Sequence, residues 1–155
     1  MATIKLTQDF KEFLNLLNSE QIEYLLIGGY AVWLYGYMRP TKDIDIWVAT
    51  DPANESRILE VLVKFGFDRL SLKRPLFPDN RTQLRMGFPP NQIELLSHIA
   101  GVDFRECYAR RRMMEIEGMM IPVIDYDDLL QNKRAANREG DRVDVSRLEK
   151  RRRKP

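Results

Sequence analysis

The chain has 155 residues, of which 44% are hydrophobic and 31% are charged, and its formal net charge of +2 does not by itself require a nucleic-acid partner. No apolar run approaches the roughly 20 residues that a membrane helix needs, so we expect no membrane partner. A single cysteine, Cys107, excludes an internal disulfide, and with a charged N-terminus that does not resemble a signal peptide it predicts a cytoplasmic protein.

The first predicted elements are a helix and a strand. Residues 7–18 place apolar side chains at helical spacing, and Thr7 is suited to cap the helix; the apolar positions are Phe10, Phe13, Leu14 and Leu17. The apolar run 23–27 predicts a strand that ends at a glycine pair.

Gly28 and Gly29 permit a sharp turn from this strand into a predicted helix, 30–37. A helix that begins at such a turn offers free N–H groups to an anion. The loop 38–42 contains proline and basic residues, and it leads into a predicted strand, 43–49.

The C-terminal two-thirds of the chain also contain both predicted helices and predicted strands. An irregular, basic segment, 68–80, interrupts them. We predict helices over 56–65, 103–111, 125–137 and 141–150, and strands over 83–88, 92–96, 113–116 and 119–124, with the four strands forming two hairpins. One domain of the α/β (α+β) class follows, a mixed sheet flanked by helices over residues 1–150, with a basic tail at 151–155. The basic runs 110–112 and 151–154 are compatible with a nucleic-acid partner.

Acidic and apolar residues alternate at the start of the strand 43–49. Side chains of a strand point to opposite faces in turn, so Asp43 and Asp45 share one face while Ile44 and Ile46 face a core. Neighbouring carboxylates repel each other, and a cation between them relieves the repulsion. The plainer alternative is that both aspartates lie on an exposed strand face without a ligand.

The glycine pair and the acid pair together resemble the signature of the nucleotidyltransferase superfamily, which has the polymerase-beta-like fold. The resemblance is to small prokaryotic members from toxin–antitoxin and abortive-infection systems in particular. The residues that fill the signature in order are Ile27, Gly28, Gly29, Asp43, Ile44, Asp45 and Ile46. Gly29 stands where many active members have serine, which leaves only backbone donors for phosphate at that position.

The resemblance implies a metal site made by Asp43, Asp45 and a third carboxylate on a neighbouring strand, which Glu94 would supply. These three residues would be catalytic and would hold Mg²⁺, whose remaining ligands are water and substrate phosphates. Alternatively, Glu94 is a charge that protects an edge strand from aggregation.

The resemblance also implies a site for a nucleoside triphosphate, with Gly28 and Gly29 at its floor. Arg39, Thr41 and Lys42 precede the acid pair, where positive charge would meet phosphates or the acceptor, although Arg39 and Lys42 fit a solvated loop equally well. On the later helix, Lys133 and Arg134 are candidates for the outer phosphates, and the family favours Lys133. The alternative for both is a solvated helix face.

The leading function is transfer of a nucleoside monophosphate from a triphosphate to a protein or RNA acceptor, with a partner protein of a toxin–antitoxin pair as a further expectation. A second possibility is a catalytically silent antitoxin or nucleic-acid-binding module. A third, a small-molecule transferase, is disfavoured because the chain has no room for a second substrate domain.

Overall fold

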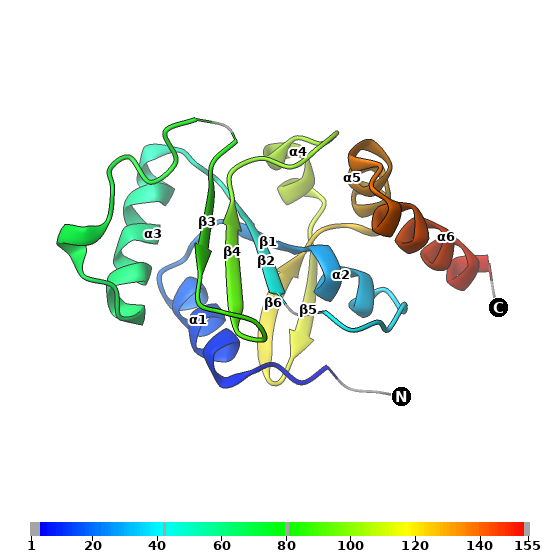
Figure 1. The fold of residues 1–155 in the computed structure, drawn as a ribbon, viewed down its shortest axis with the longest axis horizontal. Coiled ribbons are helices and arrows are strands. Elements are labelled where there is room, and N and C mark those ends of the chain that lie inside the picture. The colour runs from blue at the N-terminus through cyan, green and yellow to red at the C-terminus, as the bar shows by residue number, and fades with distance from the viewer. Residues whose placement is uncertain (1–3, 42, 80, 154–155) are drawn as a thin grey trace.

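A computed structural model describes residues 4–41, 43–79 and 81–153 of the chain (Figure 1). Its centre is a six-stranded mixed sheet in the order β3-β4-β2-β1-β6-β5. The strands are β1 (Tyr24–Ile27), β2 (Asp43–Val48), β3 (Gln83–Met86), β4 (Gln92–Leu96), β5 (Arg112–Ile116) and β6 (Met119–Val123). The helices are α1 (Gln8–Ser19), α2 (Gly28–Leu34), α3 (Pro52–Phe65), α4 (Phe104–Ala109), α5 (Tyr126–Ala136) and α6 (Glu139–Arg153), with a short 3₁₀ turn at Arg69–Ser71. The predicted α/β architecture is confirmed.

The register of the sheet brings the two halves of the sequence motif together. β1 runs antiparallel to β2, and Ile27 lies opposite Asp45. β2 runs parallel to β4, and Asp45 lies beside Glu94. The glycine turn that follows β1 and the predicted third carboxylate therefore flank the acid pair from opposite sides.

The hydrophobic core is built on the predicted periodicities. Ile44 and Ile46 of β2 are fully buried, as the alternation in that strand predicts. Phe13 of α1 packs edge to face against Phe65 of α3, with ring centroids 5.1 Å apart. Full burial of a side chain such as Phe13 contributes about 1.5–3 kcal/mol, and its contact with Phe65 joins α1 to α3. In Figure 1, α3 and α6 lie at opposite ends of the molecule, with the sheet between them.

Several helix boundaries differ from the sequence expectation, each for a local reason. α2 begins at Gly28 itself and ends at Leu34, earlier at both ends than predicted. α3 begins at Pro52 because Asp51 accepts a hydrogen bond from the Asn54 N–H and caps the helix, and proline is well suited to the first turn. α6 starts at Glu139 and continues to Arg153, so residues 151–153 of the expected tail are helical.

Within the described ranges, no helix is both long enough and apolar enough to cross a membrane.

Candidate active site

A cleft of about 710 Å³ opens between the β2–β4 part of the sheet and the last two helices. Its lining includes eight of the ten residues that the sequence predicts for the site: Gly28, Gly29, Arg39, Thr41, Asp43, Asp45, Glu94 and Lys133. Of the other two, Lys42 lies outside the described residues, and Arg134 does not line the cleft. The fold therefore brings together residues that are up to about a hundred positions apart in the chain.

The two glycines leave space that other side chains of the cleft occupy. Gly28 has a φ of +68°, which favours glycine, and a Cβ atom there would overlap the Oδ2 atom of Asp45. At Gly29, a Cβ atom would lie 2.5 Å from Oγ1 of Thr41 and 3.3 Å from Nη1 of Arg39. Serine at position 29 would therefore require Thr41 to shift.

The acid pair Asp43 and Asp45 lies on one face of β2, within the cleft. The Oδ1 atom of Asp43 is buried and has no hydrogen-bond partner among the described residues. Burial, the neighbouring Glu94 and the charge of Asp43 together raise the pKa of Asp45 to about 7, while Lys133 acts in the opposite direction. A buried carboxylate oxygen without a hydrogen-bond partner and a raised pKa both indicate that ionised acids are disfavoured at this place.

Glu94 lies where the sequence predicts it, but one of its oxygens is already engaged. Arg85, its cross-strand neighbour on β3, donates from Nε to Oε1 at a distance of 2.8 Å. Sequence analysis did not single out Arg85. The hairpin register would have identified it, because residues that face each other across an antiparallel pair are close enough to interact.

Asp43 and Asp45 fit a magnesium ion as a two-carboxylate seat. Mg²⁺ commonly takes only one or two protein carboxylates and completes its shell with water and phosphate oxygens. The orphaned oxygen of Asp43 is suited to such a contact. Among residues 4–41, 43–79 and 81–153, however, no group of three or more acidic, histidine or cysteine side chains is arranged as a metal-binding cluster. The three-carboxylate seat expected with Glu94 is therefore not preformed.

The opposite wall of the cleft carries cations that are held by buried acids. Lys133 donates from Nζ to Asp141 at 3.1 Å and lies 3.1 Å from a carboxylate oxygen of Asp144, and only 8% of its side chain is exposed. Arg39 donates from Nε and Nη2 to the two oxygens of Asp144, at 2.8 and 2.9 Å. Arg138 donates from Nε to Asp141 at 2.7 Å. The solvated-face alternative is therefore wrong for Lys133.

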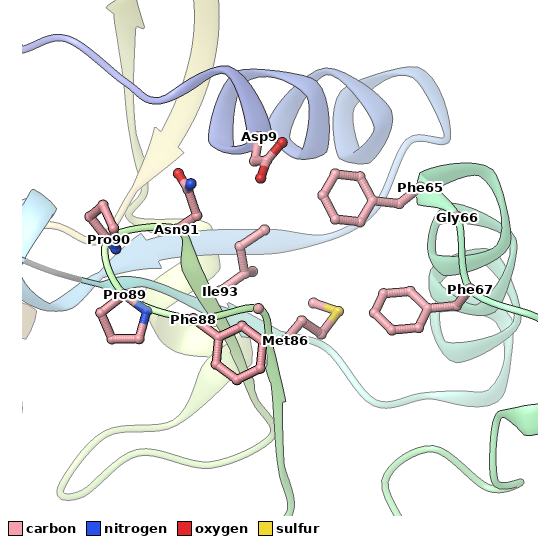
Figure 2. A pocket seen from close by; sticks show the side chains of 11 residues that line it. Asp9, Phe65, Gly66, Phe67, Met86, Phe88, Pro89, Pro90, Asn91 and Ile93 are labelled. Atoms are coloured by element: carbon pink, nitrogen blue, oxygen red, sulfur yellow. The ribbon is translucent and has the colours of Figure 1, made fainter.

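A second hollow, of about 530 Å³, is apolar and lies on the other face of the sheet. Figure 2 shows Phe65, Phe67 and Phe88 around it, with Asp9 pointing towards it from α1. Ile93 lines this hollow whereas Glu94, the next residue on β4, lines the cleft, and neighbours on a strand point to opposite faces. None of the predicted site residues lines this hollow, whereas eight of them line the cleft.

Residues 4–150 match the family model described as "Nucleotidyltransferase of unknown function (DUF6036)". The chain belongs to this family. It is thus a nucleotidyltransferase, and the matched range contains every one of the cleft residues named above.

Solved structures share the fold of this nucleotidyltransferase. The lincosamide antibiotic adenylyltransferase LnuA, in a lincomycin-bound crystal structure, superposes with a TM-score of 0.61 at 18% identity, over 94% of this chain and 98% of LnuA. TM1012 from Thermotoga maritima, a proposed nucleotidyltransferase, superposes with a TM-score of 0.59 at 18% identity, over 91% of this chain and 88% of its own. Among curated proteins, no sequence matches the chain.

Two site residues of this nucleotidyltransferase escaped the sequence analysis. Asp141 and Asp144 are three positions apart in α6, so they project from the same side of the helix. Both are almost fully buried in a helix whose exposed side chains are mostly basic. That contrast is visible in the sequence, but its meaning depends on knowing which side of α6 faces the cleft. Arg134, the other phosphate candidate, pairs with Glu149 outside the cleft.

Proposed function

We propose that this nucleotidyltransferase moves a nucleoside monophosphate from a triphosphate to a hydroxyl group of a protein or RNA acceptor, in a reaction that requires Mg²⁺. One observation carries the proposal. A single cleft presents the acid pair Asp43 and Asp45 on one wall and the cations Arg39, Lys133 and Arg138 on another. A triphosphate with its metal ion is complementary to both walls, since the metal suits the acids and the phosphates suit the cations.

Asp43 and Asp45 are the residues that would hold the magnesium ion. When bound, the ion would make the attacking hydroxyl more acidic and neutralise charge on the phosphates. The contribution of the chain is to fix the two carboxylates on a rigid central strand, where their repulsion in the absence of a cation favours binding of one.

The cations on the opposite wall would bind the outer phosphates and stabilise the leaving pyrophosphate. In the reaction, the acceptor oxygen forms a bond to the α-phosphorus, the bond between that phosphorus and the pyrophosphate oxygen breaks, and a carboxylate of the cleft or water takes the hydroxyl proton. Arg39 is placed for this role because its Nη1 atom lies beside Gly29, at the floor of the cleft. Charge-assisted contacts of this kind are the main catalytic device in phosphoryl transfer.

The chemical class of the acceptor is a separate part of the proposal. Exposed basic residues along α6 support a macromolecular acceptor: Arg142, Arg147, Lys150, Arg151 and Arg152. Given the resemblance to toxin–antitoxin proteins, a partner protein of such a pair is a specific candidate.

A small-molecule hydroxyl is the second candidate, and the likeness to LnuA favours it. The alignment covers 98% of LnuA and 94% of this chain. A chain of this size can therefore act on an antibiotic without a second substrate domain. The size argument against a small-molecule acceptor consequently fails.

The test is a labelling screen with the purified protein. Each of the four labelled ribonucleoside triphosphates is incubated with Mg²⁺ and, separately, with total RNA, total protein or a panel of hydroxylated antibiotics. We expect label on one class of acceptor in the parent, and none with Asp43→Asn or with a metal chelator present. Magnesium-dependent triphosphate binding without any transfer would support the silent binding module instead, and absence of both binding and transfer would refute the proposal.

A further inference from the structure

Burial of the two carboxylates of α6, Asp141 and Asp144, costs free energy, and the hydrophobic core does not require it. Asp141 and Asp144 are only 3% and 2% exposed. Taking a charge out of water costs several kcal/mol, and replacing a buried ion pair by apolar side chains often leaves stability unchanged or improves it. Their burial therefore points to a role beyond holding α6 in place.

α6 also has attachments that do not depend on these acids. Leu148 is fully buried, and its carbonyl oxygen accepts a hydrogen bond from the Tyr126 hydroxyl at 2.9 Å. Arg134 of α5 pairs with Glu149 of α6 at 2.6 Å. These contacts join α5 to α6 through residues that do not line the cleft.

Asp144 joins the two cations that come from different parts of the chain. Its Oδ1 and Oδ2 atoms accept from Nε and Nη2 of Arg39 in a bidentate arrangement, and Oδ2 also lies 3.1 Å from Nζ of Lys133. Arg39 belongs to the loop before β2, and Lys133 belongs to α5. One carboxylate therefore sets the separation between a loop cation and a helix cation.

The same contacts leave one face of each cation available. With Nε and Nη2 occupied by Asp144, the Nη1 atom of Arg39 donates to its neighbouring Pro40 carbonyl at 3.3 Å and lies beside Gly29. An ammonium group has three donors, and Asp141 and Asp144 account for two of those of Lys133. Each cation therefore keeps donor capacity in the wall of the cleft.

We propose that Asp144 is a positioning residue, assisted by Asp141, that orders Arg39 and Lys133 for the β- and γ-phosphates of the triphosphate. The inference rests on the proposed function and adds the residues that preorganise its phosphate site. Long basic side chains lose rotamer freedom when they are fixed, and a buried acid that fixes them in advance removes that cost from binding.

The experiment compares two ligands that differ only in the outer phosphates. Binding of a non-hydrolysable triphosphate with Mg²⁺ and binding of the matching nucleoside monophosphate are measured by titration for the parent and for Asp144→Asn. Asparagine keeps the shape of the side chain but removes its charge. We expect Asp144→Asn to weaken triphosphate binding about tenfold and to change monophosphate binding less than about twofold.

Asp128→Asn is the matched control. Asp128 is also a buried aspartate, 5% exposed, and it pairs in a bidentate manner with Arg110 outside the cleft. The variant removes a buried charge of the same kind, so it measures the cost of a structural ion pair. We expect it to lower the melting temperature without a selective effect on the triphosphate.

Asp144→Asn can fail to fold, so Arg39→Lys serves as a second variant. The Arg39 side chain is 30% exposed in the parent. Lysine at this position keeps the charge but cannot make the bidentate contact to Asp144. We expect the same triphosphate-selective loss.

The outcomes separate two kinds of failure. If the parent does not bind the triphosphate, the proposed function fails. If the parent binds it and Asp144→Asn or Arg39→Lys binds both ligands as the parent does, the positioning role fails. Tighter triphosphate binding by Asp144→Asn would also overturn it, because Asp144 would then be a competitor of the phosphates. An equal loss for both ligands, or a loss matched by Asp128→Asn, would reduce Asp144 to a structural residue.

Discussion

Replacing Asp45 by asparagine should stabilise the metal-free protein at alkaline pH. In the folded chain, burial, the neighbouring Glu94 and the charge of Asp43 raise the pKa of Asp45 from 3.8 to about 7. Between these two pH values the folded protein keeps a proton that the unfolded chain releases. The free energy of unfolding therefore decreases as pH rises through this window, and the full penalty is present above pH 7.

The gain in unfolding free energy expected for Asp45→Asn follows from the raised pKa of Asp45. A raise of roughly three pKa units corresponds to no more than about 4 kcal/mol at 1.36 kcal/mol per unit. Part of the raise in the pKa of Asp45 comes from its interactions with Glu94 and Asp43, so we expect Asp45→Asn to gain only about 1–3 kcal/mol at pH 8. At pH 4, where the folded carboxyl is protonated and the unfolded one is only a little over half ionised, the gain should fall to a small fraction of its value at pH 8.

Urea unfolding of the parent and of Asp45→Asn in the presence of a metal chelator measures the gain in unfolding free energy at pH 4 and at pH 8. Asp128→Asn is the opposite control, since it removes an acid that is paired with Arg110 and should destabilise the protein at pH 8. Added Mg²⁺ should stabilise the parent at pH 8 and have less effect on Asp45→Asn. A gain that is the same at both pH values, or a loss at pH 8, would refute the reasoning from repulsion between the carboxylates.

Three further substitutions test other parts of the cleft. Asp43→Ala should abolish Mg²⁺-dependent transfer without loss of the fold, and a radiolabel assay with circular dichroism checks both; unchanged transfer would exclude the two-carboxylate seat. Gly29→Val should be inactive and less stable because its Cβ would lie 2.5 Å from Thr41 Oγ1, and an active, stable variant would show that the loop can move away. Lys133→Ala should weaken triphosphate binding at least about tenfold, and it should also cost about 1.5–3 kcal/mol in unfolding free energy because it removes the buried cation that Asp141 and Asp144 share, while each acid keeps an arginine partner. Calorimetric titration and urea unfolding measure the two effects, and an unchanged stability would contradict the buried network.

The last of these predictions shows what the sequence could and could not provide. The sequence left two environments open for Lys133, a phosphate site and a solvated helix face, and in neither would its loss be expected to change stability much. Its real environment depends on Asp141 and Asp144, which reach it only because α6 folds back over α5. Contacts between separate elements of this kind leave no periodic signal in the chain.

The acid pair was predictable for the opposite reason. Asp43 and Asp45 are placed by the alternation of a single strand, and the buried Ile44 and Ile46 between and beyond them fix which way they point. The hairpin that carries Glu94 was equally local. The ion pair between Glu94 and Arg85 joins two predicted strands. It depends on the register between those strands, which the residue pattern of either strand alone does not give.

The place of β2 in the sheet has a consequence for motion. β2 has β4 on one side and β1 on the other, and further strands protect both of those neighbours from solvent. Amide protons of such a central strand exchange only when much of the domain opens, whereas helices at the edge of a domain open more easily. Asp43 and Asp45 are thus anchored in the slowest-exchanging part of the molecule, and Lys133 and Asp144 belong to the terminal helices. Any adjustment of the cleft around a substrate will come from α5, α6 and the loop that carries Arg39, with the acid pair as the fixed point of reference.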